Sequence, residues 1–363
     1  MTSPIARLVE YGQSPWYDNL TRALARGGLR RLVDEHGIRG VTSNPTIFEK
    51  AIGAGSDYDE QLREEVGRGA DARTAYWALV ERDIADAADL LRPSFDAWER
   101  ADGYVSIEVD PDLAHDTEAT VEQARELFER LGRPNVMIKI PATVEGLPAI
   151  TRSIAAGINV NVTLIFSLDR YRSVIEAYLE GLEARVGRGE PVDGIASVAS
   201  FFVSRVDTET DRRLPDGHPL RGKAAIANAK LAYQLFLETF AGSRWDALAA
   251  AGARLQRPLW ASTSTKNPAY SPTRYVDELI GPDTVNTLAQ PSVDALAAGQ
   301  GDLRPGTLTE RVDEARAVID GLAEAGVDFD DVTATLEREG VAAFSASFHD
   351  ALDTLEKKAR DLT

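Results

Sequence analysis

The chain contains no cysteine, and this absence excludes several kinds of chemistry. Disulfide bonds, thiolate nucleophiles and cysteine-ligated zinc sites cannot form. Histidine is also scarce: the four histidines are scattered without ligand-like spacing, so we expect no histidine-based metal site. No segment reaches the roughly 18 uninterrupted apolar residues of a membrane span, and the N-terminus lacks a basic stretch followed by an apolar run. These absences predict a soluble cytoplasmic protein without a metal centre.

Positive charge is in short supply as well. The chain has 40 basic and 58 acidic residues, which gives a formal net charge of -18. A charge of this sign disfavours binding to nucleic acids or to anionic membrane surfaces. It is still compatible with a small local cluster of cations that holds a phosphate group.

Among the basic residues, lysine is the rare one. Seven of the 40 are lysines, so the other 33 are arginines. An arginine cannot deprotonate in a protein and therefore cannot become a nucleophilic amine, so a lysine in such a chain can mark a position where an amine is needed. We interpret Lys50, Lys357 and Lys358 as solvated surface residues, which leaves few candidates for a reactive amine.

Short apolar or β-branched runs alternate with long amphipathic stretches, the pattern of a parallel sheet with crossover helices. Seven runs predict strands at 38–45, 104–109, 135–142, 158–166, 195–203, 257–263 and 284–289, and a weaker run predicts an eighth at 6–11. Eight strands with intervening helices favour an α/β fold of the (β/α)8 TIM-barrel type over an open doubly wound sheet. No GxGxxG turn follows the first strand, so a dinucleotide-binding sheet is not indicated.

Two helical regions exceed what a minimal barrel needs. The stretch from about 56 to 100 is longer than one crossover requires and predicts a helical insertion. Residues from about 308 to 363 predict extra C-terminal helices that pack on the barrel exterior or across its mouth. No low-complexity linker or internal repeat is present, so we expect a single domain over residues 1–363.

Alternation within the predicted strands separates an apolar face from a polar one. Ser106 and Glu108 share one face of their strand. In the strand at 135–142, Ile138 and Ile140 share one face, and Lys139 lies on the opposite face. Gly40, Thr42 and Asn44 share one parity in the strand at 38–45, and the polar residues Asn159, Asn161 and Thr163 share one face of theirs. The apolar faces suit contact with helices, so the polar faces should line the interior, near the strand ends where barrel active sites are built.

Lys139 is the sharpest feature of this interior. Burial among apolar neighbours disfavours the ammonium form, and a neutral amine is a nucleophile toward carbonyl groups. The simpler interpretation, a lysine that extends out of the strand end into solvent, fits less well because Glu108, Asn44, Asn161 and Thr163 should converge on the same mouth.

A second cluster indicates a phosphate site. Arg205 and Lys266 each follow a late strand, and Ser200, Ser204 and Ser264 lie nearby in the sequence. Loops after the late strands of a barrel frequently hold phosphate, and cations with hydroxyl donors supply charge-assisted hydrogen bonds. Together these residues favour an anionic ligand.

Several motifs of the chain resemble those of the transaldolase family. The resemblance is carried by SPWYDNL, GVTSNPTIFEKAI, YVSIEVDPDLAHDTEAT, VMIKIPATVEGLPAI, GINVNVTLIFS, SVASFFVSRVD and LWASTSTKNPAYSPTRYVDELIGPDTVNTL. It runs from near residue 14 to the C-terminal helices. TSNP, IKIPAT and NVTLIFS in this order are highly specific together, whereas any one alone is not.

The resemblance implies a (β/α)8-barrel enzyme of the non-oxidative pentose phosphate pathway. Such an enzyme moves a dihydroxyacetone unit between sedoheptulose 7-phosphate with glyceraldehyde 3-phosphate and erythrose 4-phosphate with fructose 6-phosphate, and it needs no cofactor. The implied partners are small sugar phosphates, with no nucleic acid or membrane, and the chain is expected to be a monomer or homodimer.

The resemblance also implies residue roles. Lys139 matches the Schiff-base lysine, Asp18 the carboxylate that handles the C4 hydroxyl proton, and Glu108 the acid/base acting through a water. Thr163 matches the residue that positions this water. The substrate-binding matches are Thr42, Asn44, Asn161, Ser200, Arg205, Ser264 and Lys266. Many family members have arginine where Lys266 stands, so here a point charge replaces a bidentate fork.

Two other functions are compatible with the sequence. Another lysine-dependent aldolase that releases free dihydroxyacetone would share the barrel and the lysine. A catalytically silent barrel that senses sugar phosphates would share the polar interior but would have no need of an amine at Lys139.

Overall fold

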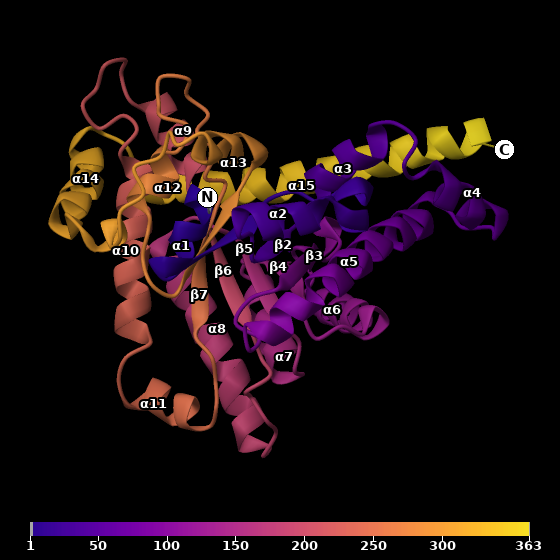
Figure 1. Cartoon of the computed structure of the whole chain (residues 1–363). Coiled ribbons are helices and arrows are strands. Elements are labelled where there is room, and N and C mark those ends of the chain that lie inside the picture. Colours follow the sequence, from indigo (N-terminus) through magenta and orange to yellow (C-terminus); the bar gives the residue numbers. More distant parts are fainter. Residues whose placement is uncertain (1–2, 363) are drawn as a thin grey trace.

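The computed structural model describes residues 3–362. Their parallel strands form a closed barrel in sequential order from β1 to β8, and Figure 1 shows the helices arranged around it. The strands are β1 Gln13–Tyr17, β2 Gly40–Thr42, β3 Tyr104–Glu108, β4 Val136–Pro141, β5 Val160–Ile165, β6 Ser197–Phe202, β7 Gln256–Ala261 and β8 Thr284–Leu288. β1 pairs with both β2 and β8, which closes the barrel. The predicted (β/α)8 barrel is therefore confirmed.

Helices surround the barrel and connect its strands. The first half contains η1 Pro4–Ala6, α1 Arg7–Glu10, η2 Leu24–Gly28, α2 Leu29–His36, α3 Pro45–Gly53, α4 Asp59–Gly67, α5 Ala72–Ala97, η3 Pro111–Leu113, α6 Thr117–Leu131 and α7 Gly146–Ala155. The second half contains α8 Leu168–Gly187, α9 Ser204–Arg213, α10 Ala224–Thr239, α11 Ser243–Ala250, α12 Arg274–Glu278, α13 Gln290–Ala297, η4 Thr307–Thr309, α14 Val312–Glu324 and α15 Phe329–Leu362. Within the described residues, no helix is long and apolar enough to cross a bilayer.

The predicted strand at 6–11 is wrong. These residues form η1 and α1, because the Ser3 hydroxyl accepts a hydrogen bond from the Ile5 amide and Pro4 favours the first helical position. The first strand is β1. Its sequence does not look like a strand because Pro15, a residue that disfavours strands, lies within it. Pro15 is accommodated because its carbonyl still accepts a hydrogen bond from the Arg39 amide at 2.8 Å.

The other seven strands lie where the sequence predicts them, with two differences: β2 is shorter than predicted, and β5 contains an irregularity near its end. β2 ends at Thr42 because the Asn44 side chain accepts a hydrogen bond from the Ile47 amide and thereby caps α3. In β5, Leu164 has a φ of 59° at a shift in register between Val162 and Ile165. A bulge of this kind redirects the side chain that follows the regular part of the strand.

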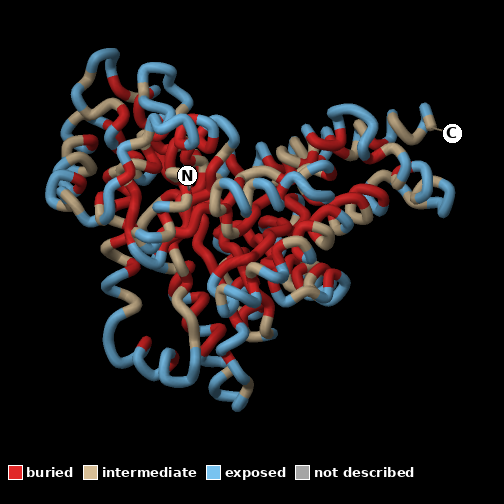
Figure 2. The backbone as a smooth tube through the Cα atoms, viewed as in Figure 1, coloured by how far each residue is buried: buried red, intermediate tan, exposed pale blue. Residues whose placement is uncertain are grey.

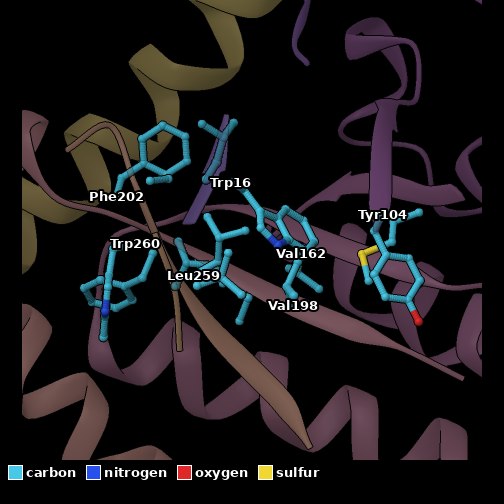
Figure 3. Packing of buried hydrophobic residues seen from close by; sticks show 14 of the residues in the cluster. Trp16, Tyr104, Val162, Val198, Phe202, Leu259 and Trp260 are labelled. Carbon is cyan, nitrogen blue, oxygen red and sulfur yellow. The ribbon is translucent and has the colours of Figure 1, made fainter. Parts of the chain in front are cut away.

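The strand register places the predicted polar residues on one side. Glu108 pairs with Lys139 across β3 and β4, and Lys139 pairs with Asn161 across β4 and β5. Neighbouring residues in register point to the same side of a sheet, so these three side chains share the barrel interior. Nearer the amino-terminal end of the barrel, Trp16 and Tyr104 lie with ring centres 6.3 Å apart (Figure 3). Figure 2 shows that burial is concentrated in the strands and in the helix faces that cover them.

The long helix α15 crosses the carboxyl ends of the strands. It packs against α3, α5, α9 and β5, and Figure 1 shows it passing from the barrel toward α3 and α4. The Thr46 and Ser347 hydroxyls are 2.8 Å apart, and the Ser345 hydroxyl donates to Asp112 at 2.7 Å. Thr46 and Asp112 follow β2 and β3, so α15 is fixed over the barrel mouth.

Candidate active site

Lys139 is a buried amine with few protein partners. Its Nζ donates a hydrogen bond to the Ser43 carbonyl oxygen at 3.2 Å and lies 3.7 Å from Glu108 Oε2. Each of the two side chains is only 5% exposed. A lysine and a carboxylate buried at this separation can exchange a proton through one water, or directly once a small side-chain movement brings them within hydrogen-bond distance.

Glu108 is the acid/base candidate beside this amine. Burial raises the pKa of its carboxyl to about 7, although the Lys139 ammonium opposes the change. Glu108 Oε2 is buried and accepts no hydrogen bond from the described residues. A carboxyl group that titrates near neutrality can donate or accept a proton at physiological pH.

A chain of hydrogen bonds fixes the amide beside the amine. The Asn161 Nδ2 group donates to the Ser106 hydroxyl at 2.9 Å, and the Ser200 hydroxyl donates to Asn161 Oδ1 at 2.7 Å. By contrast, the Thr42 and Thr163 hydroxyls are buried and have no hydrogen-bond partner in residues 3–362. Buried hydroxyls without partners are costly, so both are suited to a water or a substrate hydroxyl.

Asp18 and Asn44 lie at the ends of β1 and β2. Asp18 directly follows β1 and is partly buried. Burial raises the pKa of its carboxyl, and the cations of Lys139, Lys266 and Arg205 oppose this change, so the site gathers these charges around Asp18. Asn44 uses its Oδ1 to cap α3, which fixes the orientation of its side chain at the strand end.

Arg205, near the start of α9, is a cation without a polar partner. Within the described part of the chain, no group forms a hydrogen bond or ion pair with its guanidinium. Its Cζ lies 5.1 Å from the ring centre of Phe202 and 5.8 Å from that of Phe344. Burial lowers the pKa of this guanidinium, and the carboxylates of Asp18, Glu108 and Glu339 oppose the change.

The remaining predicted residues lie on a neighbouring loop. Lys266 is exposed between β7 and α12 and interacts electrostatically with Asp18. The Ser264 hydroxyl is 3.4 Å from the Ser292 hydroxyl, and Ser204 and Ser262 form a closer pair at 2.9 Å. This loop therefore adds hydroxyl groups and a point charge to the side of the mouth that holds Arg205.

Three contributors to the site were not predicted as site residues. Ser106 shares the predicted interior face, and that parity was the signal that could have identified it as a partner of Asn161. Ser43 contributes a main-chain carbonyl, which no side-chain pattern reveals. Phe344 comes from α15, and nothing local in its sequence indicates that it reaches Arg205.

Comparison with known proteins assigns this chain to a family. The model of the Transaldolase/Fructose-6-phosphate aldolase family matches residues 15–355. A transaldolase of Saccharopolyspora erythraea is 52% identical over 360 residues, which cover 98% of this chain and 98% of the relative. Transaldolase 2 of Streptomyces avermitilis is 48% identical over 368 residues, covering 100% and 99%. The chain belongs to the transaldolase/fructose-6-phosphate aldolase family, and its full-length relatives place it among the transaldolases, transferases of the pentose phosphate pathway.

Proposed function

We propose that the chain transfers a dihydroxyacetone unit between sugar phosphates through a Schiff base on Lys139. The donors and acceptors are sedoheptulose 7-phosphate with glyceraldehyde 3-phosphate, and erythrose 4-phosphate with fructose 6-phosphate. The observation that carries the proposal is the buried pair of Lys139 and Glu108, whose groups lie 3.7 Å apart at the barrel mouth. Asn161 and unpartnered hydroxyls lie in the same interior.

The first step forms the Schiff base. The neutral amine of Lys139 adds to the C2 carbonyl of the ketose, and the resulting carbinolamine loses its hydroxyl as water. Glu108 gives a proton to the departing hydroxyl through a water that Thr163 holds, and it accepts a proton back when the imine is later hydrolysed. The pKa of Glu108, raised to about 7 by burial, suits both directions of transfer.

The second step breaks the C3–C4 bond. Asp18 accepts the proton of the C4 hydroxyl, the C4 oxygen becomes an aldehyde, and the electron pair of the C3–C4 bond moves into the protonated imine. The enamine left on Lys139 then attacks the aldehyde carbon of the acceptor, and Asp18 returns the proton to the new hydroxyl. The electrostatic interaction between Asp18 and Lys139 supports this division of roles.

The remaining residues hold the substrate. Thr42, Asn44, Asn161 and Ser200 are proposed to bind the hydroxyls of the dihydroxyacetone unit. Arg205, Lys266 and Ser264 are proposed to bind the phosphate at the far end of the sugar. Arg205 supports this assignment best, because its guanidinium is largely buried yet has no carboxylate or carbonyl of the described chain to bind.

Borohydride trapping tests the proposed lysine. Reduction in the presence of fructose 6-phosphate should give a covalent adduct on Lys139, and Lys139→Arg should abolish it. Lys230 is a matched control, because its side chain is also buried, at 4% exposure, but it lies away from the mouth on α10. Lys230→Arg should leave trapping intact. An adduct on Lys230 or Lys266 would overturn the proposal.

An acceptor-dependence assay separates transfer from simple aldol cleavage. The family includes fructose-6-phosphate aldolases as well as transaldolases. We expect release of free dihydroxyacetone from fructose 6-phosphate to be slow unless an acceptor aldehyde is present. Release without an acceptor at the rate of transfer would assign the chain to the aldolase activity instead.

A further inference from the structure

Arg205 is held between two aromatic rings that come from distant parts of the sequence. Phe202 ends β6 and is followed closely by Arg205, so its contact is local. Phe344 belongs to α15, well over a hundred residues later in the chain, and it is 3% exposed. A guanidinium stacks favourably on aromatic faces and keeps its N–H groups at the edge, where they can bind an anion.

A glycine allows α15 to approach this closely. A Cβ added to Gly340 would lie 2.9 Å from Leu164 Cδ2 and 3.6 Å from an Nη of Arg205. Glycine in a helix interior costs about 1 kcal/mol relative to alanine, so its presence one turn before Phe344 requires a compensating reason. Here the missing side chain lets the backbone of α15 lie directly over β5 and Arg205.

Other contacts fix the helix in this position. Asp112, in η3, accepts a hydrogen bond from the Ser345 hydroxyl at 2.7 Å and lies 3.1 Å from His349 Nε2. Thr46 and Ser347 add a contact to α3. Phe344 is therefore carried on a rigid element, as a residue that restrains a functional group should be.

We propose that Phe344 is a positioning residue for the Arg205 guanidinium, and that α15 thereby sets the preference of the site for phosphorylated over unphosphorylated sugars. This inference rests on the proposed phosphate-binding role of Arg205. Arg205 has no polar partner in the described chain to orient it before substrate arrives. The ring of Phe344 limits its rotation and leaves its donors free, so the phosphate meets a guanidinium that is already oriented.

The test compares two substitutions on the same helix. Phe344→Leu removes the aromatic face but keeps an apolar filler next to Arg205. Phe348→Leu is the matched control: Phe348 is also fully buried, and it packs on Tyr76, with ring centres 4.9 Å apart. Thermal melts followed by circular dichroism should show similar losses of stability for the two variants, because both replace a buried phenylalanine by leucine.

Kinetics should distinguish the two variants. With D-glyceraldehyde as acceptor, Phe344→Leu should raise the KM for fructose 6-phosphate and the inhibition constant of inorganic phosphate about fivefold, the scale of a partly buried cation–π contact. Its kcat, and its KM for unphosphorylated fructose, should stay unchanged. Phe348→Leu should change neither KM. Equal effects of the two variants, or an equal loss with fructose, would overturn the proposal.

A double substitution separates this proposal from the one on which it rests. Arg205→Ala should weaken binding of phosphorylated sugars, and adding Phe344→Leu to that variant should have no further effect. If Arg205→Ala weakens phosphate binding and Phe344→Leu does not, the positioning role is wrong while the phosphate site stands. If Arg205→Ala has no phosphate-specific effect, the phosphate assignment fails and the role of Phe344 fails with it.

Discussion

The two ends of the barrel treat buried charge in opposite ways. At the amino-terminal end, the Asp102 carboxylate is 2% exposed and accepts hydrogen bonds from Ser14 at 2.6 Å, Trp16 at 3.0 Å and Arg257 at 3.0 Å. Arg39 adds an ion pair at 3.5 Å. Every oxygen of this carboxylate is therefore satisfied by the protein itself.

At the mouth, polar groups lack the partners that would satisfy them. Glu108 Oε2, Thr42 Oγ1 and Thr163 Oγ1 are buried without hydrogen bonds from residues 3–362, and the contacts of Arg205 within that range are with aromatic rings. Unsatisfied buried polar groups cost stability unless a ligand or water completes them. Amide oxygens of Gln13, Asn135 and Gln256, at the amino-terminal strand ends, are also buried without hydrogen bonds. The difference between the two ends therefore lies in the charged groups: Asp102 is satisfied by the protein, whereas Glu108 Oε2 and the Arg205 guanidinium are not.

The largest expected effect comes from removing the amine at the mouth. Lys139→Met should lower kcat at least about a thousandfold, the scale seen when a covalent nucleophile is removed. The fold should survive, because the Glu108 carboxyl left behind, whose pKa burial already raises to about 7, can take up a proton. Initial rates and a denaturant titration measure the two quantities. Retention of activity would show that the lysine is structural.

At the opposite end, the same kind of change should affect stability and not chemistry. Asp102→Ala leaves Arg39 and Arg257 without their carboxylate and should destabilise the fold by about 3–5 kcal/mol. The kcat of the folded fraction should not change. Denaturant unfolding and active-site-normalised rates provide the check. A loss of kcat with unchanged stability would reverse the division between the two ends.

The phosphate cations should show a smaller and more selective effect. Arg205→Ala should raise the KM for fructose 6-phosphate about ten- to a hundredfold, as expected for lost charged hydrogen bonds, and leave the KM for fructose unchanged. Lys266→Ala should have a weaker effect of the same kind, because Lys266 is exposed. Steady-state kinetics with both sugars measures the selectivity. Equal losses for fructose would remove Arg205 from the phosphate site.

The last prediction concerns the pH dependence of stability and Glu108. Burial raises the pKa of Glu108 in the folded state to about 7 from an ordinary value of 4.5, so the folded state binds this proton more tightly than the unfolded state does. The contribution of the protonated Glu108 carboxyl to the free energy of unfolding is fully present below pH 4.5 and is lost as the pH rises through about 7. Glu108→Gln should therefore reduce the loss of stability between about pH 5 and pH 8, by roughly 2 kcal/mol.

Unfolding free energies of wild type and variant, measured at both ends of this pH range, test the prediction. A steeper loss of stability in Glu108→Gln than in the wild type would contradict the predicted direction.

Alternation along the strands is enough to predict much of the fold and the centre of the site. Parity alone places Lys139, Glu108 and Asn161 on one face, and the register confirms that face. The prediction succeeds because β3, β4 and the regular part of β5 are covered by helices on one side, so the apolar and polar positions separate cleanly.

The rest of the site depends on contacts between distant segments. Asp18 follows β1, but Pro15 interrupts the alternating pattern of this strand. The sequence therefore predicts the first strand at 6–11 instead, and only the family resemblance points to Asp18. The course of α15 over Arg205 is fixed by Gly340 and by Asp112 in η3. Neither residue carries a local signal for such a contact, because each acts only once the barrel has assembled.

The carboxylate of Asp102 also bears on the order in which the barrel assembles. Arg257 lies 155 residues further along the chain, on β7, while Ser14 lies on β1. Forming this pairing closes a loop of 155 residues, which costs conformational entropy, so we expect it at a late stage of folding. Contacts made after the rate-limiting step slow unfolding without speeding folding. Asp102 should therefore slow the unfolding of the closed barrel and lengthen the lifetime of the native state.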